Sequence, residues 1–301
     1  RLVRSSDVSG AFLNGIELLP SAEGSVIRNL QLGGFSTGAA ILVGGAKNVL
    51  VDNVVLGRDI NGPLPNRYGV YVVDVMADSP GSIAGTDFTT ISNSEIYSSS
   101  DSGIYIGANA NNVRVVGNII GTPNEGNSIG VKIDSVTGRN VLGAAPIIEP
   151  IPGVQAVARS NKLLLPIKDA TGARMFNPDD LFLGQPLTSA DGLSIATGTV
   201  ITAIEERYSE NDPTELIGIE LTLSQELTNT ANISVVVTPS DRRNTIQYNS
   251  DGVVLETGSS RMVMTDVTRS VFDGIVINGV GTSKLTPTGQ HQIGGVEYAG
   301  V

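Results

Sequence analysis

Short stretches of alternating apolar and polar residues recur along the chain, and most of them begin with a glycine. In each copy, glycine precedes an apolar–any–apolar triplet, as in Tyr68-Gly69-Val70-Tyr71-Val72 and Ser102-Gly103-Ile104-Tyr105-Ile106. Alternation over four or five residues is the period of a half-buried β-strand. The pattern therefore predicts a short strand in every copy. The other copies lie at 14–18, 37–41, 129–133, 251–255 and 273–277.

A second motif, apolar–any–Asn–any–apolar, lies between these copies, with Asp266 in the asparagine position of a variant. Asparagine tolerates the left-handed backbone conformation at a corner, and glycine likewise permits positive φ there. In stacked turns of chain, successive asparagine amides would lie above one another and satisfy backbone groups inside the corner. The motif therefore predicts a structural asparagine ladder. Its expected members are Asn29, Asn53, Asn93 and Asn118.

The spacing of the repeat indicates a solenoid. Where the repeat is uninterrupted, successive repeat glycines lie 22 to 34 residues apart, which leaves room for two or three short strands and their corners. One such coil cannot bury its apolar face alone, so the coils must stack. No useful apolar stripe of helical period is evident, and Gly and β-branched residues dominate. We therefore expect an all-β chain of stacked coils.

The repeat resembles right-handed parallel β-helix proteins, the architecture of pectate lyases, related carbohydrate-active enzymes and phage tailspikes. The resemblance lies in the Gly–apolar–any–apolar copies and the asparagine column, and it covers roughly 10–143 and 241–295. It implies a right-handed parallel β-helix solenoid. Many bacterial surface proteins and viral fibres have the same signature, so it specifies the architecture better than the activity.

The repeat is interrupted in the middle of the chain. It stops after Arg139-Asn140-Val141-Leu142 and resumes at Arg243-Asn244-Thr245-Ile246, two fragments that look alike. Prolines between 146 and 152 mark the boundary. Alternating runs inside the interruption predict a small antiparallel β domain, a sandwich or a barrel, with strands at 193–195, 199–204, 219–223 and 233–237. We expect β-helix coils over 1–144, the inserted domain over 145–241 and further coils over 242–301.

Composition narrows the classes of function. The chain has 19 Lys and Arg against 30 Asp and Glu, a net charge of −11, which argues against sequence-independent binding of nucleic acid and against binding to anionic lipid surfaces. No apolar run reaches 18 residues, so no membrane insertion is expected. There is no Cys, and His291 is the only histidine, so a catalytic triad or a multi-histidine metal centre would have to be built on it. His291 lies in a glycine-flanked segment, 289–295, that is expected to form another corner between strands. A lone histidine at such a position is more often a surface residue than a catalytic base.

The middle residue of each Gly–apolar–any–apolar copy is expected to point outward. Tyr71 and Tyr105 would then lie on adjacent coils about 4.8 Å apart, with Lys132 on the next. Two tyrosine faces beside an ammonium could stack a sugar ring and bind a uronate carboxylate. The alternative is an aromatic stack that covers the sheet and packs against a loop or another chain. The whole expected column is Glu17, Ala40, Tyr71, Tyr105, Lys132, Val254 and Val276.

Catalysis on a polysaccharide would need a different set of groups. A lyase needs a base that removes the proton next to a uronate carboxylate and a calcium ion or an arginine that stabilises the enolate. A glycoside hydrolase needs two or three converging carboxylates. No spacing singles out such a set, so we predict no catalytic residue. The groups available to a lyase are Asp52, Asp74, Glu95, Asp101, Arg114, Lys132 and Asp134. Those available to a hydrolase are Asp74, Asp78, Asp87, Glu95 and Asp101.

An acidic segment at 205–215 is the candidate metal site. Its carboxylates could bind Ca²⁺, the one cofactor considered, although the segment does not match the twelve-residue calcium-loop pattern. The alternative is a solvated hairpin turn. The candidate ligands are Glu205, Glu206, Glu210, Asp212 and Glu215.

We therefore predict a structural and binding β-helix module of a fibre, adhesin or tailspike-like protein, located outside the cell, on the cell surface or on a virion. Trp is absent, no catalytic set converges, and 295–301 carries no obvious cap, so the solenoid is expected to continue or to meet another chain. The module would assemble with other protein chains, as a homo-oligomer or in a larger fibre or virion assembly, and could contact surface polysaccharide. The alternative is a polysaccharide lyase or glycoside hydrolase that acts on an acidic polysaccharide along the β-helix face; a trimeric tailspike would combine both roles.

Overall fold

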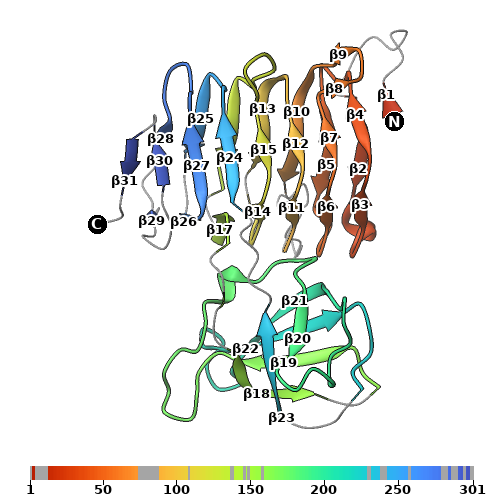
Figure 1. Cartoon of the computed structure of the whole chain (residues 1–301), viewed down its shortest axis with the longest axis vertical. Coiled ribbons are helices and arrows are strands. Elements are labelled where there is room, and N and C mark those ends of the chain that lie inside the picture. The colour runs from red at the N-terminus through yellow and green to blue at the C-terminus, as the bar shows by residue number, and fades with distance from the viewer. Residues whose placement is uncertain are drawn as a thin grey trace. The chain divides into compact units, whose positions relative to one another are not determined.

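The chain divides into two compact units: Arg1–Ala144 with Arg242–Val301, and Ala145–Asp241. We call them the first and the second unit. Both consist of strands, so the chain is all-β as predicted (Figure 1). Among the described residues the only helical turns are two short 3₁₀ turns, η1 (Pro20–Ala22) and η2 (Pro178–Asp180). The computed structural model describes 2–3, 13–73, 88–107, 109–135, 139–144, 147, 150–156, 159–228, 232–237, 243–256, 259–278, 284–285, 291–293 and 296–298.

Three large sheets, which we call A, B and C, make up most of the described part of the first unit, and all their pairings are parallel except that of β30 with β31. Sheet A contains β1 (Leu2–Val3), β4 (Gln31–Gly33), β7 (Val55–Leu56), β12 (Glu95–Ile96), β15 (Ile119–Ile120), β24 (Asn244–Gln247), β27 (Thr265–Thr268), β30 (His291–Ile293) and β31 (Val296–Tyr298). Sheet B contains β2 (Ile16–Leu18), β5 (Ala39–Gly44), β10 (Asn66–Val73), β13 (Ser99–Ile106), β16 (Ile129–Ile133), β25 (Asp251–Leu255) and β28 (Ile275–Ile277). Sheet C contains β3 (Val26–Arg28), β6 (Leu50–Asp52), β11 (Thr90–Ser92), β14 (Arg114–Val116), β17 (Arg139–Leu142), β26 (Ser259–Met262) and β29 (Lys284–Leu285). A small hairpin, β8 (Arg58–Asp59) and β9 (Gly62–Pro63), leaves the corner between β7 and β10.

From β2 to β30 the chain visits the three sheets in a fixed order, B then C then A, and each strand pairs with the strand of the preceding visit to its sheet (Figure 1). We call one passage through the three sheets a circuit. The register is continuous from one circuit to the next: Val70 pairs with Ile104, Ile104 with Val131, and Val131 with Val253. These four side chains are fully buried. Aliphatic residues from all three sheets join one core, to which sheet A contributes Leu56 and sheet C contributes Ile91.

The repeat glycines are required for a reason other than the one expected. Gly69, Gly103 and Gly130 are not among the residues with positive φ. They lie instead where neighbouring strands approach closely: a Cβ on Gly69 would lie 2.4 Å from the Gly103 carbonyl oxygen, and one on Gly103 would lie 2.7 Å from that of Gly130. A side chain therefore collides with the backbone of the next circuit. The expectation that these glycines supply a positive φ at a corner was wrong.

The second unit contains one six-stranded antiparallel sheet in its described residues, in the order β20-β23-β18-β19-β22-β21. Leu163, Leu221 and Val235 are buried in it. The strand expected at 193–195 is absent: these residues belong to a turn in which Ser194 Oγ donates to Asp191 Oδ2 at 2.5 Å. The strands are β18 (Ile151–Ala156), β19 (Lys162–Pro166), β20 (Leu187–Ser189), β21 (Ile201–Tyr208), β22 (Leu216–Leu223) and β23 (Asn232–Val237).

The second unit occupies one corner of a circuit. In five other circuits, from β3 to β27, only two residues separate the sheet C strand from the sheet A strand, such as Asn53 and Val54 between β6 and β7. The second unit lies between β17 and β24, at the same kind of corner. The two fragments that look alike are therefore not equivalent, because 139–142 lies in sheet C and 244–246 lies in sheet A.

Candidate binding face on sheet B

Three tyrosine rings form a cluster on sheet B. Tyr71 on β10 and Tyr105 on β13 are register partners, and their ring centroids lie 5.0 Å apart with planes inclined by 16°. Tyr68 completes the cluster, at 5.5 Å from Tyr105 and 5.0 Å from Tyr71. Tyr68 is buried, whereas the other two tyrosines are partly exposed. The structure therefore brings together the two predicted tyrosines and adds a third that the repeat pattern did not single out.

Lys132 extends the cluster along the same column. It is the register partner of Tyr105, and its Nζ lies 5.6 Å from the centroid of that ring. The ammonium also lies 3.6 Å from Glu256 Oε1. The Tyr105 hydroxyl donates to Asp134 Oδ2 at 3.1 Å. The predicted set of Tyr71, Tyr105 and Lys132 thus lies on one face, with two carboxylates beside it.

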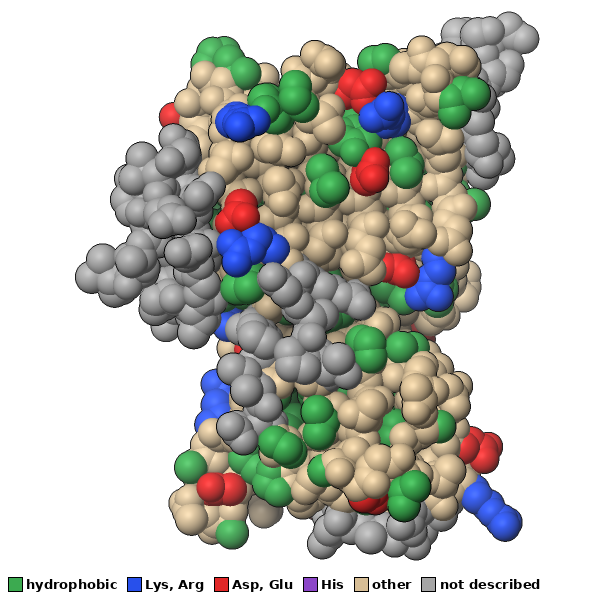
Figure 2. Space-filling view, viewed as in Figure 1, with side chains coloured by type: hydrophobic (Ala, Val, Ile, Leu, Met, Phe, Trp, Pro, Cys, Tyr) green, Lys and Arg blue, Asp and Glu red, His purple; other side chains and the backbone are tan. Residues whose placement is uncertain are grey.

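A second cation lies at the other side of the cluster. The Arg67 guanidinium carbon lies 5.1 Å from the Tyr68 ring centroid, and Arg67 Nε lies 3.7 Å from Asp101 Oδ2. Ser102 Oγ donates to Asp101 Oδ1 at 3.0 Å. Each cation of the face is therefore matched by a carboxylate. A similar pairing recurs elsewhere on the first unit, where most basic side chains in view lie beside acidic ones (Figure 2).

Burial changes the acidity of the tyrosine hydroxyls. Desolvation, with a smaller contribution from the Asp101 carboxylate, raises the pKa of Tyr68 to about 12. Desolvation also raises the pKa of Tyr71, and together with Asp134 it raises that of Tyr105. All three hydroxyls are neutral at physiological pH, so they act as hydrogen-bond donors and acceptors and not as anions.

The rest of the outward column differs from the expected one at a single position. Glu17 and Tyr71 both pair with Leu42, not with Ala40. Ala40 is fully buried and lies level with Gly15. Ala40 was predicted to point outward because the copy at 37–41 was aligned on Gly38. Gly38 lies two residues before the position that the other repeat glycines occupy. The observed column is Glu17, Leu42, Tyr71, Tyr105, Lys132, Val254 and Val276.

The four asparagines expected in one ladder divide between two neighbouring columns. Asn29, Asn53 and Asn93 are the exposed residues that follow a sheet C strand, and their φ values of 58°, 52° and 49° are left-handed. Asn53 Nδ2 donates to Asn29 Oδ1 at 2.7 Å. Asn118 lies one residue farther along its corner and is fully buried, while Gly117, with φ of 70°, takes the left-handed position.

Asn118 belongs to an internal ladder of polar side chains. Its Oδ1 accepts from Ser94 N at 3.0 Å, and its Nδ2 donates to the Ile91 carbonyl at 2.9 Å. Asn244 continues the ladder, because its Oδ1 accepts from Asn118 N at 3.1 Å. In the following circuit Thr265, and not the expected Asp266, occupies this column. The ladder satisfies backbone groups that the corner removes from water.

A second ladder at the corner between sheets A and B was not foreseen from the sequence. Asn127 Oδ1 accepts from Ser99 N at 2.9 Å, and Asn249 Oδ1 accepts from Asn127 N at 2.9 Å. Both asparagines are buried. A signal for them exists, because Asn127 and Asn249 each begin an Asn–Ser–any–Gly run that ends at a repeat glycine.

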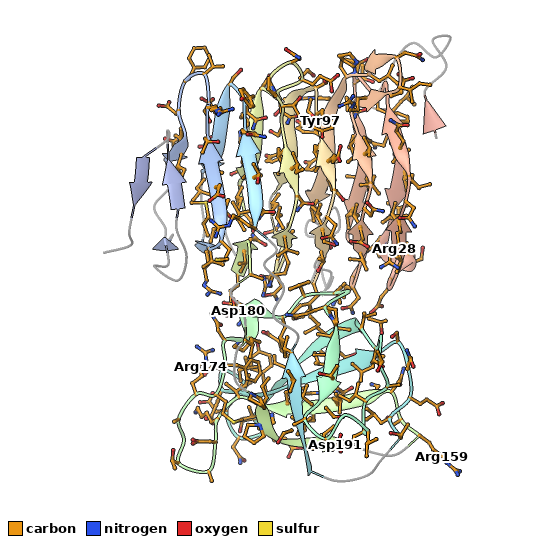
Figure 3. The ribbon with its side chains drawn as sticks, in the orientation of Figure 1. Arg28, Tyr97, Arg159, Arg174, Asp180 and Asp191 are labelled. Atoms are coloured by element: carbon orange, nitrogen blue, oxygen red, sulfur yellow. The ribbon has the colours of Figure 1, made fainter. Side chains whose placement is uncertain are left out.

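The groups considered for catalysis do not converge. Asp52 lies on sheet C, where Arg28 Nε is 3.0 Å from its Oδ2 (Figure 3); Glu95 lies on sheet A and Asp101 on sheet B. Arg114 is buried and donates from Nη1 to the Arg139 carbonyl at 2.7 Å. Lys132 and Asp134 lie beside the tyrosine cluster. Asp74, Asp78 and Asp87 lie outside the described residues, as does the side chain of His291.

The acidic segment of the second unit is spread along a hairpin. Each carboxylate with a described contact has a different neighbour, and among the described residues no three His, Cys, Asp or Glu side chains are grouped to hold a metal. Glu210 is exposed. The contacts are Glu205 with Arg207, Glu206 with the Tyr208 hydroxyl, Asp212 with Thr214, and Glu215 with Lys168. The calcium site therefore stays a prediction that these contacts do not support.

Comparisons with known proteins add no assignment. No known protein family matches the chain, and no curated protein matches it. No helix within the described parts is long and apolar enough to cross a membrane.

Proposed function

We propose that the three sheets of the first unit wind as one right-handed parallel β-helix, and that the protein is a structural and binding module of an extracellular or virion-surface fibre, adhesin or tailspike-like protein. The fixed order of sheets, the parallel register and the shared core support the architecture. The circuits stack side chains of one column at intervals of about 4.8 Å. Such columns give an elongated, regular surface to which other chains and long polymers can bind.

The observation that carries the functional proposal is the outward column of sheet B. Its middle holds stacked aromatic rings, and the column continues into two apolar residues, Val254, which is buried, and Val276, which is partly exposed. By contrast, Asp52, Glu95 and Asp101 lie on three different sheets. An aromatic and aliphatic face with scattered acids suits contact with another chain or a sugar ring better than it suits a reaction centre.

Under this proposal, a sugar ring packs on Tyr71 and Tyr105, and a uronate carboxylate pairs with Lys132. Glu256 already neighbours that ammonium, and the two side chains are 26% and 32% exposed. A partly exposed ion pair of this kind is worth at most about 1 kcal/mol, so a uronate can displace the glutamate. Glu256 is therefore expected to weaken, but not prevent, binding of an acidic polysaccharide.

Titration of tyrosine fluorescence with oligogalacturonate tests this face, because the chain has no Trp to mask the signal. Tyr105→Ala is expected to weaken binding about tenfold through loss of ring stacking. Glu256→Gln is expected to strengthen it by freeing Lys132. Tyr208→Ala, on the exposed end of β21, is the matched control and should leave binding unchanged. Equal affinity in all four proteins would contradict the proposed sugar contact.

Two further measurements separate a fibre module from an enzyme. Light scattering should give a mass above that of one chain, and a protein that stays monomeric at high concentration counts against assembly. Pectin, alginate and capsular polysaccharides should show no rise in reducing ends or in absorbance at 235 nm. Reproducible turnover of any of them would favour the polysaccharide lyase or glycoside hydrolase instead.

A further inference from the structure

A groove of about 450 Å³ runs along the corner at which the chain passes from sheet A to sheet B. It lies on the first unit, none of the three clustered tyrosines is among its lining residues, and five successive passages from sheet A to sheet B line it. Four steps of about 4.8 Å between those passages give the groove a length of roughly 19 Å along the stacking direction. A groove of this form suits an elongated ligand, not a compact one.

The lining combines hydroxyl and amide groups with apolar ends. Ser98, Ser100, Ser128 and Ser250 provide hydroxyl groups along the groove, and Asn124 provides an amide. These groups can form hydrogen bonds without carrying charge, although the Ser128 hydroxyl, which donates to the Ser100 carbonyl at 2.9 Å, is left to accept. Polar groups of this kind fix the orientation of a ligand whose own surface is rich in hydroxyl groups.

Apolar surface lies at both ends of the groove. Pro63 and Pro65 line one end, and Tyr248 and Val271 line the other. The Tyr248 ring also has the Arg269 guanidinium carbon 5.2 Å from its centroid. Flat apolar surfaces of this kind pack against the C–H faces of a ligand while its edges form hydrogen bonds.

The electrostatics of the groove favour an uncharged ligand. Glu125 is the only ionisable acid in its described lining. Its Oε2 lies 3.3 Å from Arg58 Nη1, and that guanidinium lies 5.3 Å from the Tyr97 ring centroid. The carboxylate is thus balanced within the protein. The other described lining residues carry no charge, and the Arg269 guanidinium beside Tyr248 lies outside the lining.

The backbone under the groove is held in place. Ser98 and Tyr248 have φ of 51° and 55°, and a Cβ on Gly126 would lie 1.9 Å from the Tyr248 carbonyl oxygen. The buried Asn127 and Asn249 amides bond to each other, with Asn127 Nδ2 2.9 Å from Asn249 Oδ1. A groove that is rigid before binding loses little conformational entropy when a ligand enters.

We propose that this groove binds an uncharged linear oligosaccharide, lying along the stacking direction with sugar faces against Tyr248 and the two prolines. An extended peptide fits less well, because the backbone groups of the corner are already paired. Ser250 N donates to the Asn127 carbonyl at 2.9 Å, and Val271 N donates to the Asn249 carbonyl at 2.9 Å. These two backbone donors are therefore not free to extend a sheet with a peptide strand.

The test uses the full chain, isotopically labelled for NMR, with cellohexaose, maltohexaose, mannohexaose and xylohexaose as probes. At least one probe should shift the amide signals of Ser98, Ser100 and Tyr248. Two variants then test the site. Tyr248→Asn removes the ring while keeping a residue that tolerates positive φ, and should weaken binding at least about tenfold. Ser100→Trp, at an exposed position, should block the groove without disturbing the core.

The controls separate this groove from the face on sheet B. Tyr105→Ala should leave binding of the hexasaccharide unchanged, and Tyr248→Asn should leave binding of oligogalacturonate unchanged. Both groove variants should unfold at the temperature of the parent protein. The proposal is overturned if no uncharged hexasaccharide shifts those signals, if a deca-proline peptide or oligogalacturonate shifts them instead, or if the folded Ser100→Trp variant binds as well as the parent.

Discussion

Asparagine has two different roles at the corner between sheets C and A: one residue adopts the left-handed backbone conformation and another forms buried hydrogen bonds. The sequence motif did not distinguish them. Asn93 is exposed and supplies a left-handed φ of 49°. Asn118 is buried and bonds to three backbone or side-chain partners in neighbouring circuits. The motif predicted an asparagine ladder because both residues lie in similar local sequence. It could not separate the two, since the offset of one residue shows only when the circuits are in register.

Because Asn118 forms buried hydrogen bonds, its truncation is expected to lower the stability of the chain substantially. Asn118→Ala leaves Ser94 N and the Ile91 carbonyl without their partner inside the corner, which should lower the free energy of unfolding by about 1–3 kcal/mol. Asn93→Gly is the matched control and should cost less, at most about 1 kcal/mol, because glycine adopts positive φ without strain and only the exposed hydrogen bond from Asn93 Nδ2 to Asp52 Oδ1 is lost. Denaturant unfolding of both variants measures the difference. A loss as large for Asn93→Gly as for Asn118→Ala would refute the division of roles.

The tyrosine cluster predicts a dependence on alkaline pH. The pKa of Tyr68 is about 12 in the folded chain because of desolvation and Asp101, whereas in the unfolded chain it returns to about 10. The folded state therefore keeps a proton that the unfolded state has lost, and stability should fall as pH rises from about 10 to about 12. Absorbance at 295 nm should show a tyrosinate component with a midpoint near pH 12. Tyr68→Phe should remove this component, and an unchanged titration would contradict the assignment.

At the scale of the strand, the repeat pattern located most of sheet B but misjudged one copy. Tyr71 and Tyr105 lie side by side because the alternation in 68–72 and 102–106 is regular. In the copy at 37–41 the pattern assigned Ala40 to the outward column, whereas Leu42 occupies it. From the sequence, Gly38, which precedes its strand, could not be distinguished from a glycine such as Gly69, which contacts the adjacent strand of the sheet. That difference arises from backbone contacts between circuits, which local sequence does not encode.

Close approach between strands makes the repeat glycines sensitive to substitution. A Cβ on Gly130 would lie 2.5 Å from the Gly252 carbonyl oxygen, so Gly130→Ala must separate two paired strands and should cost more than about 2 kcal/mol. Gly107→Ala is the matched control, because its nearest contact is a Tyr71 ring carbon at 3.1 Å, which can move. Thermal unfolding compares the two variants. If Gly130→Ala is as stable as Gly107→Ala, close backbone approach is not the reason for the glycine.

At the scale of the whole molecule, the strand content and the parallel stacking follow from residues that recur, such as Val70 and Ile104. The loss of the repeat between 144 and 242 was visible for the same reason. The sequence did not show at which corner the second unit is inserted, because Asn140 and Asn244 have similar neighbours yet lie in different sheets. The groove was also invisible, since its lining comes from five passages that are adjacent only in the stack.

The place of the second unit predicts that it can be removed. Joining Ala144 directly to Asn244 gives a corner of the same length as that between β14 and β15, in which Gly117 and Asn118 separate the strands. The shortened chain, with Ala144→Gly to permit the left-handed corner, should keep a far-UV spectrum typical of β-structure and a cooperative unfolding transition. A shortened chain that does not fold would show that the second unit does more than occupy a corner.

Every proposal for the first unit requires that the circuits before and after the inserted second unit stack in register. In that register Ile119 on β15 lies beside Thr245 on β24. The chain has no cysteine, which permits a direct measurement by mass spectrometry after oxidation. Ile119→Cys with Thr245→Cys should form a disulfide, because adjacent strands bring the Cα atoms within the range of about 4.4–6.8 Å that a disulfide requires. Ile119→Cys with Asp266→Cys, two strands apart, should keep free thiols; the reverse result would contradict the stacking.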